Sequence, residues 1–134
     1  MCMRMQHNVF IDSMSFLSCS VRKLPEAFGL TVSKSWYPHY FNTKENLDYV
    51  GSVPGISCYG QKTKVFDNRR VFETYCQDDV TVLRQACQVF RREFIQIGNI
   101  EVLLEAITIA SACNKVLHKR FLKPDTIGLI PTGG

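Results

Sequence analysis

The sequence predicts an α+β fold, and two kinds of pattern indicate it. Short runs rich in β-branched and aromatic residues occur at 8–12 ("NVFID") and 126–130 ("TIGLI"), as in β-strands. Between them, stretches at about 67–97 and 99–121 have the spacing of apolar residues that is typical of amphipathic helices. The expected architecture is therefore two long helices packed on a few strands.

Size and charge are those of one modest domain. The chain has 134 residues and a net charge of +4, which permits a phosphate-facing surface without requiring one. No apolar run approaches the roughly 20 residues that cross a bilayer, and the first residues lack the apolar core of a secretion signal. An intracellular domain with no membrane partner is expected.

The cysteines are expected to be small buried side chains, because a reducing compartment disfavours disulfides. The six are Cys2, Cys19, Cys58, Cys76, Cys87 and Cys113. Cys113 and His118 have a loosely metal-like spacing, but no second pair completes a zinc site.

The first half of the chain contains short elements and a long irregular segment. Asp12 ends the first strand and is expected to cap a turn. A short helix is predicted over 20–29, with Ser20 as its N-cap and Gly29 as its terminator. Residues 33–62 form an irregular excursion of a length that is usually functional or part of an insertion.

The two long helices have sequence signals at their ends. Asp67 or Asn68 is the expected cap of the first helix, and Gly98 is the expected stop. Lys123 and Pro124 are expected to end the second helix, because proline cannot continue one.

An aspartate lies on the apolar face of the first long helix. The predicted apolar stripe consists of Phe72, Cys76, Leu83, Ala86, Phe90, Phe94 and Ile97. Asp79 falls inside this stripe, Asp78 falls off it, and Tyr75 precedes Asp79 by one turn. A carboxylate there is costly unless it is paired. Two interpretations stay open: an ion pair with an arginine or a bond to a backbone amide, and a ligand for a divalent metal ion.

Three blocks of this sequence match the motifs of a known family. The pattern Tyr75-x-x-x-Asp79 on a helix resembles the third exonuclease motif of the family B DNA polymerases, in particular of their protein-primed branch. The stretch "FIDSMSFLSCSVRKLPEAFGLTVSKSWYPHYFN" before it is similar to the matching region of organellar and viral enzymes and of Polinton or Maverick transposons. The stretch "TIASACNKVLHKRFLKPDTIGLIPTGG" after it is similar to the segment that joins exonuclease to palm. Together the blocks cover nearly the whole chain.

The resemblance implies part of a DNA-directed DNA polymerase that acts in DNA replication. Residues 1–122 would be the C-terminal part of a ribonuclease H-like 3′–5′ exonuclease domain, and 123–134 the start of the link to the palm. Proofreading in the family uses two Mg²⁺ or Mn²⁺ ions. Asp79 matches a metal ligand of that site, and Tyr75 matches the tyrosine that orients the attacking water. The implied partners are the single-stranded 3′ end, the template and the rest of the polymerase, in the nucleus for a transposon-derived eukaryotic protein.

Further positions match the family's signatures for DNA. Lys34 matches a branch-specific lysine that stabilises the catalytic arrangement near the scissile phosphate; without the resemblance it would be an ordinary solvated lysine. Trp36 and His39 belong to an aromatic cluster at 36–41, where one or two rings are expected to stack bases and the others to pack the loop against the sheet.

The end of the chain matches a motif that contacts the template strand. Gly133 and Gly134 match its two glycines, but Pro131 stands where the family has tyrosine, and a frayed terminus is the alternative. Basic residues near this end either face phosphate or are solvated. They are Arg91, Arg92, Lys115, Lys119, Arg120 and Lys123.

The sequence also departs from the family. No Asp-x-Glu pair of the first exonuclease motif and no palm aspartate pair occurs in it, and "NVFID" has Ile11 where the second motif has an aromatic residue. We therefore expect no polymerase or exonuclease activity from these residues alone. The alternatives are a non-catalytic DNA- or protein-binding module derived from a transposon polymerase, and an unrelated helical domain, which leaves the three matching blocks unexplained.

Overall fold

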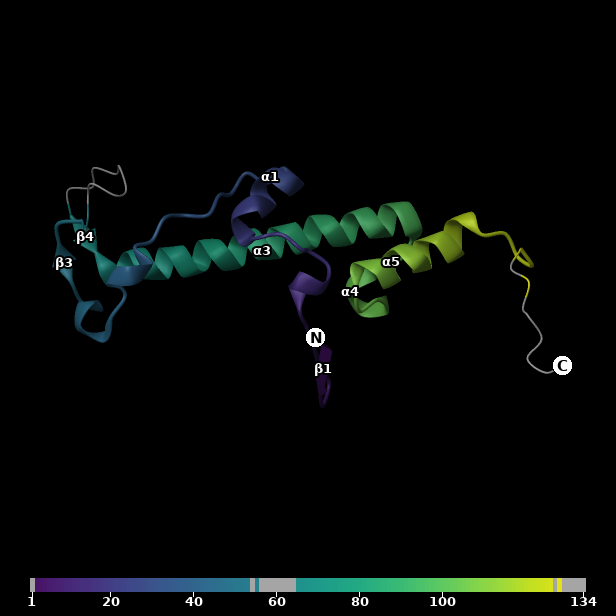
Figure 1. The fold of residues 1–134 in the computed structure, drawn as a ribbon, viewed down its shortest axis with the longest axis horizontal. Coiled ribbons are helices and arrows are strands. Elements are labelled where there is room, and N and C mark those ends of the chain that lie inside the picture. Colours follow the sequence, from purple (N-terminus) through teal and green to yellow (C-terminus); the bar gives the residue numbers. More distant parts are fainter. Residues whose placement is uncertain (1, 54, 56–64, 127, 129–134) are drawn as a thin grey trace. The chain divides into compact units, whose positions relative to one another are not determined.

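A computed structural model describes residues 2–53, 55, 65–126 and 128. They form a mixture of helices and strands, which confirms the predicted fold class (Figure 1). The chain divides into two compact units, one made of 1–19 and 87–134 and the other of 20–86. The described residues include four short 3-10 helices: η1 (Ser13–Ser15), η2 (Val21–Lys23), η3 (His39–Phe41) and η4 (Lys44–Asn46).

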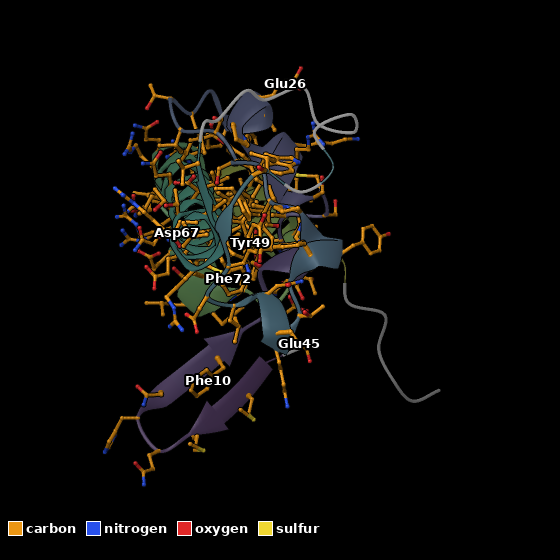
Figure 2. The ribbon with its side chains drawn as sticks, turned by 90° about the vertical axis from the view of Figure 1, so that its left-hand side faces the viewer. Phe10, Glu26, Glu45, Tyr49, Asp67 and Phe72 are labelled. Carbon is orange, nitrogen blue, oxygen red and sulfur yellow. The ribbon has the colours of Figure 1, made fainter. Side chains whose placement is uncertain are left out.

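The first unit begins with a β-hairpin. Strand β1 (Cys2–Met5) pairs antiparallel with β2 (Asn8–Ile11), so the strand expected at this position is confirmed. Figure 2 shows the two strands side by side, with Phe10 on β2; half of the Phe10 side chain is exposed. Asp12 accepts a hydrogen bond from the backbone N–H of Met14, as its predicted capping role requires.

The second unit begins with the short helix that the sequence predicts. Helix α1 (Leu24–Phe28) follows η2 directly. Gly29 ends α1 in the left-handed conformation, with a φ of 60°. Ser20 occupies the N-cap position of η2, but its side chain makes no capping bond.

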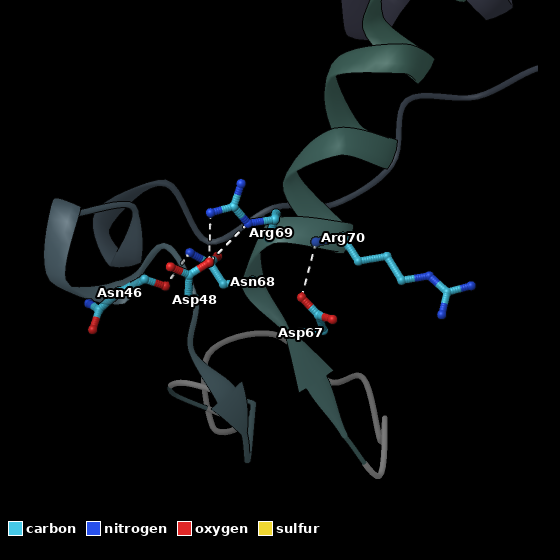
Figure 3. Close-up of polar contacts among 6 residues, drawn as sticks. All are labelled: Asn46, Asp48, Asp67, Asn68, Arg69 and Arg70. Carbon is cyan, nitrogen blue, oxygen red and sulfur yellow. Dashed lines mark hydrogen bonds and ion pairs between the residues drawn. The ribbon is translucent and has the colours of Figure 1, made fainter.

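The long helix α3 (Asn68–Gly98) has the ends that the sequence predicts. Before it, β3 (Val50–Gly51) pairs with β4 (Phe66–Asp67) in a two-stranded ladder. Asp67 Oδ1 accepts a hydrogen bond from the backbone N–H of Arg70 at 3.1 Å, which satisfies one of the free donors of the first turn (Figure 3).

The predicted apolar stripe on α3 is partly wrong. Cys76 and Ile97 are exposed, whereas Val82 is fully buried and Ala86 and Phe90 are buried as expected. The buried face therefore runs through Val82 and the half-buried Tyr75 and excludes Cys76, whereas Leu83 is half-buried. The reason is that the segment before α3 covers the Tyr75 side of the helix, which helical periodicity cannot indicate.

The single helix predicted over 99–121 is also wrong. The structure has three segments there: α4 (Val102–Glu105), α5 (Ile109–Val116) and the π-helix η5 (Leu117–Phe121). Thr108 interrupts the helix because its side chain accepts a bond from the N–H of Ser111, and the Ser111 side chain accepts one in return. The helical region ends at Phe121, before Pro124, as predicted. The strand predicted at 126–130 lies mostly outside the described residues.

The cysteines differ from the prediction that all are buried. Cys76 and Cys113 are exposed, and Cys19 and Cys87 are intermediate. Cys58 and the side chain of Cys2 lie outside the described part of the structure.

Candidate functional site

The structure brings together the three residues predicted to be catalytic. Lys34 Nζ lies 3.0 Å from Asp79 Oδ2, although 45 residues separate the two in sequence. The same nitrogen lies 4.7 Å from the centroid of the Tyr75 ring. Tyr75 and Asp79 share one face of α3, and the extended segment that follows α1 carries Lys34 to that face.

Asp79 is partly buried and is paired through one oxygen only. Its side chain is 28% exposed and that of Lys34 is 24% exposed. The ion-pair interpretation of Asp79 is thus confirmed in kind, but the partner is a lysine and not an arginine or a backbone amide. The other oxygen, Oδ1, is buried and has no hydrogen-bond partner in the structure.

The electrostatics of the pair favour a charged lysine. Burial alone would lower the pKa of Lys34, but hydrogen bonds to Tyr75 and Asp79 and the negative charge of Asp79 outweigh it, so the pKa is raised. Lys34 is therefore protonated at neutral pH, and its charge offsets that of Asp79.

Rings from the loop pack directly on Tyr75. Tyr37 is buried, and its ring centroid lies 5.5 Å from that of Tyr75 and 5.1 Å from that of Phe72. His39 meets the Tyr75 ring edge to face at 5.2 Å. Tyr37 and His39 thus pack on α3, whereas Phe41 packs on Phe66 of β4 at a ring-centroid distance of 6.0 Å, as expected for the loop against a sheet. Tyr40 is almost completely exposed.

A buried asparagine at the start of α3 holds this loop in place. Tyr37 Oη donates a 3.0 Å hydrogen bond to Asn68 Oδ1. Asn68 Nδ2 donates a 2.7 Å hydrogen bond to the carbonyl of Asn46, as Figure 3 shows. The Asn68 backbone N–H also donates to the carbonyl of Tyr49. Burial raises the pKa of Tyr37 despite the bond to Asn68, so its hydroxyl stays protonated and can donate. The sequence showed Asn68 only as a possible cap.

A pocket of about 230 Å³ lies beside Tyr75. Its lining residues are Arg22, Lys34, Ser35, Trp36, Tyr37, His39 and Tyr75. Trp36 and His39, which were predicted to bind DNA, both belong to this lining. Ser35 Oγ is buried and has no hydrogen-bond partner in the structure. Gly133 and Gly134 lie outside the described residues.

Three of the basic residues that were candidates for phosphate contacts bind protein groups instead. Arg91 Nε donates to Glu101 Oε1 at 2.6 Å. Arg120 Nε donates to the carbonyl of Ile97 at 3.0 Å, and Lys119 donates to the carbonyl of Asn99. The last two hydrogen bonds provide partners for carbonyl groups at the C-terminal end of α3 and just after it, where helix carbonyls lack partners.

One comparison with known proteins identifies the family. The model for DNA polymerase type B, organellar and viral, matches residues 2–133. The chain belongs to this family. Comparisons with curated proteins and with solved structures give no significant match.

Family membership implies DNA and the rest of a polymerase as partners of this type B DNA polymerase segment. No helix in the described part of the chain has the length and apolar character to cross a membrane.

The residues of the site fit part of a metal centre. Asp79 Oδ1 is a buried carboxylate oxygen without a partner, which is what a hard divalent cation requires of a ligand. Among the described residues, however, no three His, Cys, Asp or Glu side chains gather as a metal-binding group. These residues therefore fit one ligand position and not a complete site.

Proposed function

We propose that this segment contributes Tyr75, Asp79 and Lys34 to the 3′–5′ proofreading exonuclease site of a protein-primed type B DNA polymerase. The observation that carries the proposal is the 3.0 Å contact between Lys34 and Asp79, with Tyr75 against the same lysine. Residues from separate matching blocks meet at one point, which a chance match of short motifs would not produce.

Each residue has a role that follows from its position. Asp79 Oδ1 would hold one Mg²⁺ or Mn²⁺ ion, and the metal ions, when bound, would supply an activated water and stabilise the leaving oxygen. Lys34 holds Asp79 through Oδ2 and keeps Oδ1 directed away from itself. Tyr75 is positioned by Tyr37 and His39, and Lys34 Nζ lies 4.7 Å from the centroid of its ring. The remaining carboxylates would come from other residues of the polymerase, so the 134-residue chain is inactive alone.

The test is exonuclease activity of a polymerase that includes this segment, measured on a 5′-labelled single-stranded oligonucleotide. Asp79→Asn is expected to reduce the rate by more than about 100-fold, since even indirect support of a metal ligand is worth about 10–100-fold. Asp78→Asn is the matched control, because Asp78 is adjacent but makes no ion pair within the described residues. It should leave the rate nearly unchanged, and neither variant should abolish DNA synthesis.

Two outcomes would contradict the proposal. Equal effects of Asp79→Asn and Asp78→Asn would remove Asp79 from the site and favour a non-catalytic binding module. Metal-dependent shortening of the oligonucleotide by the 134-residue chain alone, abolished by Asp79→Asn, would show that this chain needs no further carboxylates.

A further inference from the structure

The pocket beside Tyr75 has an unbalanced positive charge. Two long cationic side chains, Arg22 and Lys34, line it. Asp79 neutralises Lys34 at 3.0 Å. Arg22 lies on η2 and is exposed, and it forms no ion pair within the described part of the chain. The pocket therefore has an excess cation at Arg22.

The other lining groups suit a flat ring attached to an anion. The rings of Trp36, His39 and Tyr75 provide surfaces on which a base can stack. Ser35 Oγ is buried without a partner and can bond to a polar group that enters the pocket. A volume of about 230 Å³ is below the range typical of sites for whole small molecules, so it suits one unit of a longer chain.

We propose that Arg22 is a further substrate-binding residue, which holds a backbone phosphate of single-stranded DNA in this pocket. The planar guanidinium matches two phosphate oxygens, and a charge-assisted pair is stronger than a neutral hydrogen bond. Ser35 Oγ provides a second hydrogen bond to the same nucleotide. The proposal rests on the proposed function, because the strand concerned is the one whose 3′ end reaches Tyr75 and Asp79.

The chain contains a direct probe of this pocket. Trp36 is its single tryptophan, and it belongs to the lining. Binding of a short oligothymidylate to the 134-residue chain should change Trp36 fluorescence. EDTA in the buffer separates binding from cleavage, so the measurement does not depend on catalysis.

The decisive comparison is between two neighbouring basic residues. Arg22→Gln should weaken oligothymidylate binding about tenfold, as expected for one hydrogen bond to a charged group. It should also reduce the slope of log affinity against log salt by about 0.7, the value for one phosphate contact of a single strand. Lys23→Gln removes the same charge from η2 but lies outside the pocket lining, and it should leave the slope unchanged. Circular dichroism confirms that each variant is folded.

A backbone substitution in the DNA identifies the phosphate itself. Replacing one phosphodiester at a time by an uncharged methylphosphonate should weaken binding to the wild-type chain at one position. The Arg22→Gln chain should show no such loss at that position.

The results separate this inference from the proposed function. If the wild-type chain binds the oligonucleotide but Arg22→Gln and Lys23→Gln behave alike, the Arg22 assignment is wrong and the site stands. If the folded wild-type chain shows no binding, both the Arg22 assignment and the pocket as a DNA site are wrong.

Discussion

The two halves of α3 use different chemistry to pack against the rest of the chain. In the first half, Asn68 and Asp79 make hydrogen bonds and an ion pair to residues of the preceding loop. In the second half, Phe90 meets Phe16 and Phe94 at ring-centroid distances of 6.0 and 4.8 Å. The first half therefore adds directional polar contacts to its ring packing, whereas Phe90 in the second half packs through apolar contacts alone.

Because of this difference, the polar contacts chiefly determine the geometry of the site, and the apolar contacts chiefly determine the stability of the fold. Polar pairs act only over short distances and narrow angles, so they fix which loop residue faces which helix residue. Apolar contacts have no preferred direction but contribute more per side chain. In the second half, Phe94 and Ile97 also line an apolar groove of about 380 Å³ with α5 and η5, and Ile97 is still more than half exposed.

The largest expected effect is at the centre of the apolar half. Phe90→Ala should lower the free energy of unfolding by about 3–5 kcal/mol, because it removes a buried ring from between Phe16 and Phe94. Urea unfolding followed by circular dichroism measures it. Phe121→Ala is the control, since Phe121 is 68% exposed and should cost much less. Similar losses for the two variants would show that burial does not determine stability here.

A substitution in the polar half is expected to cause a smaller loss of stability but also to weaken oligonucleotide binding. Asn68→Ala should cost about 3 kcal/mol, because it leaves the Tyr37 hydroxyl and the Asn46 carbonyl without partners. It should also weaken oligonucleotide binding at temperatures where the chain is still folded, since the loop carrying Lys34 loses its anchor. Phe90→Ala should leave that binding intact under the same conditions. If Asn68→Ala lowers stability without affecting binding, the anchor does not position the site.

The break between α4 and α5 offers a third test. Thr108→Ala removes the side chain that caps α5 and should cost about 1 kcal/mol. Asn114→Ala, an exposed position of the same helix outside the cap, should cost nothing. Thermal unfolding of the two variants distinguishes them, and an equal shift would show that the cap does not stabilise α5.

The smallest effect concerns pH. Hydrogen bonds from Arg91 lower the pKa of Glu101 below its ordinary value of 4.5. The stabilisation is therefore fully present above pH 4.5 and is lost as pH falls through the lower, folded-state pKa. The difference in unfolding free energy between wild type and Glu101→Gln should accordingly shrink in acid. A difference that stays constant from pH 7 to pH 3 would show that the ion pair contributes nothing.

Local signals in the sequence predicted much of the fold. Asp67 and Gly98 marked the ends of α3, and Gly29 marked the end of α1, because caps and left-handed turns depend on residues next to them. The break at Thr108 also had a local signal, since Thr108 and Ser111 have the spacing of a capping box. Apolar periodicity across 99–121 concealed it.

The site was predictable only in part, because its contacts are not local. The sequence placed Asp79 on an inward face, and the resemblance singled out Tyr75 and Lys34. That Lys34 itself pairs with Asp79 follows from the path of the loop, which no periodicity describes. No motif in the sequence indicated that Arg22 lines the pocket, since its place there depends on how η2 is held in the second unit.

The sequence separation of Lys34 and Asp79 has a consequence for the order of folding. A helix such as α3 forms from neighbouring residues in about a microsecond, whereas a contact across 45 residues must first overcome the entropy of closing the intervening chain. Tyr75 and Asp79 are therefore expected to be in helical register before Lys34 arrives. The Lys34–Asp79 pair would be among the last native contacts to form, so a newly made chain acquires its helix before it acquires its site.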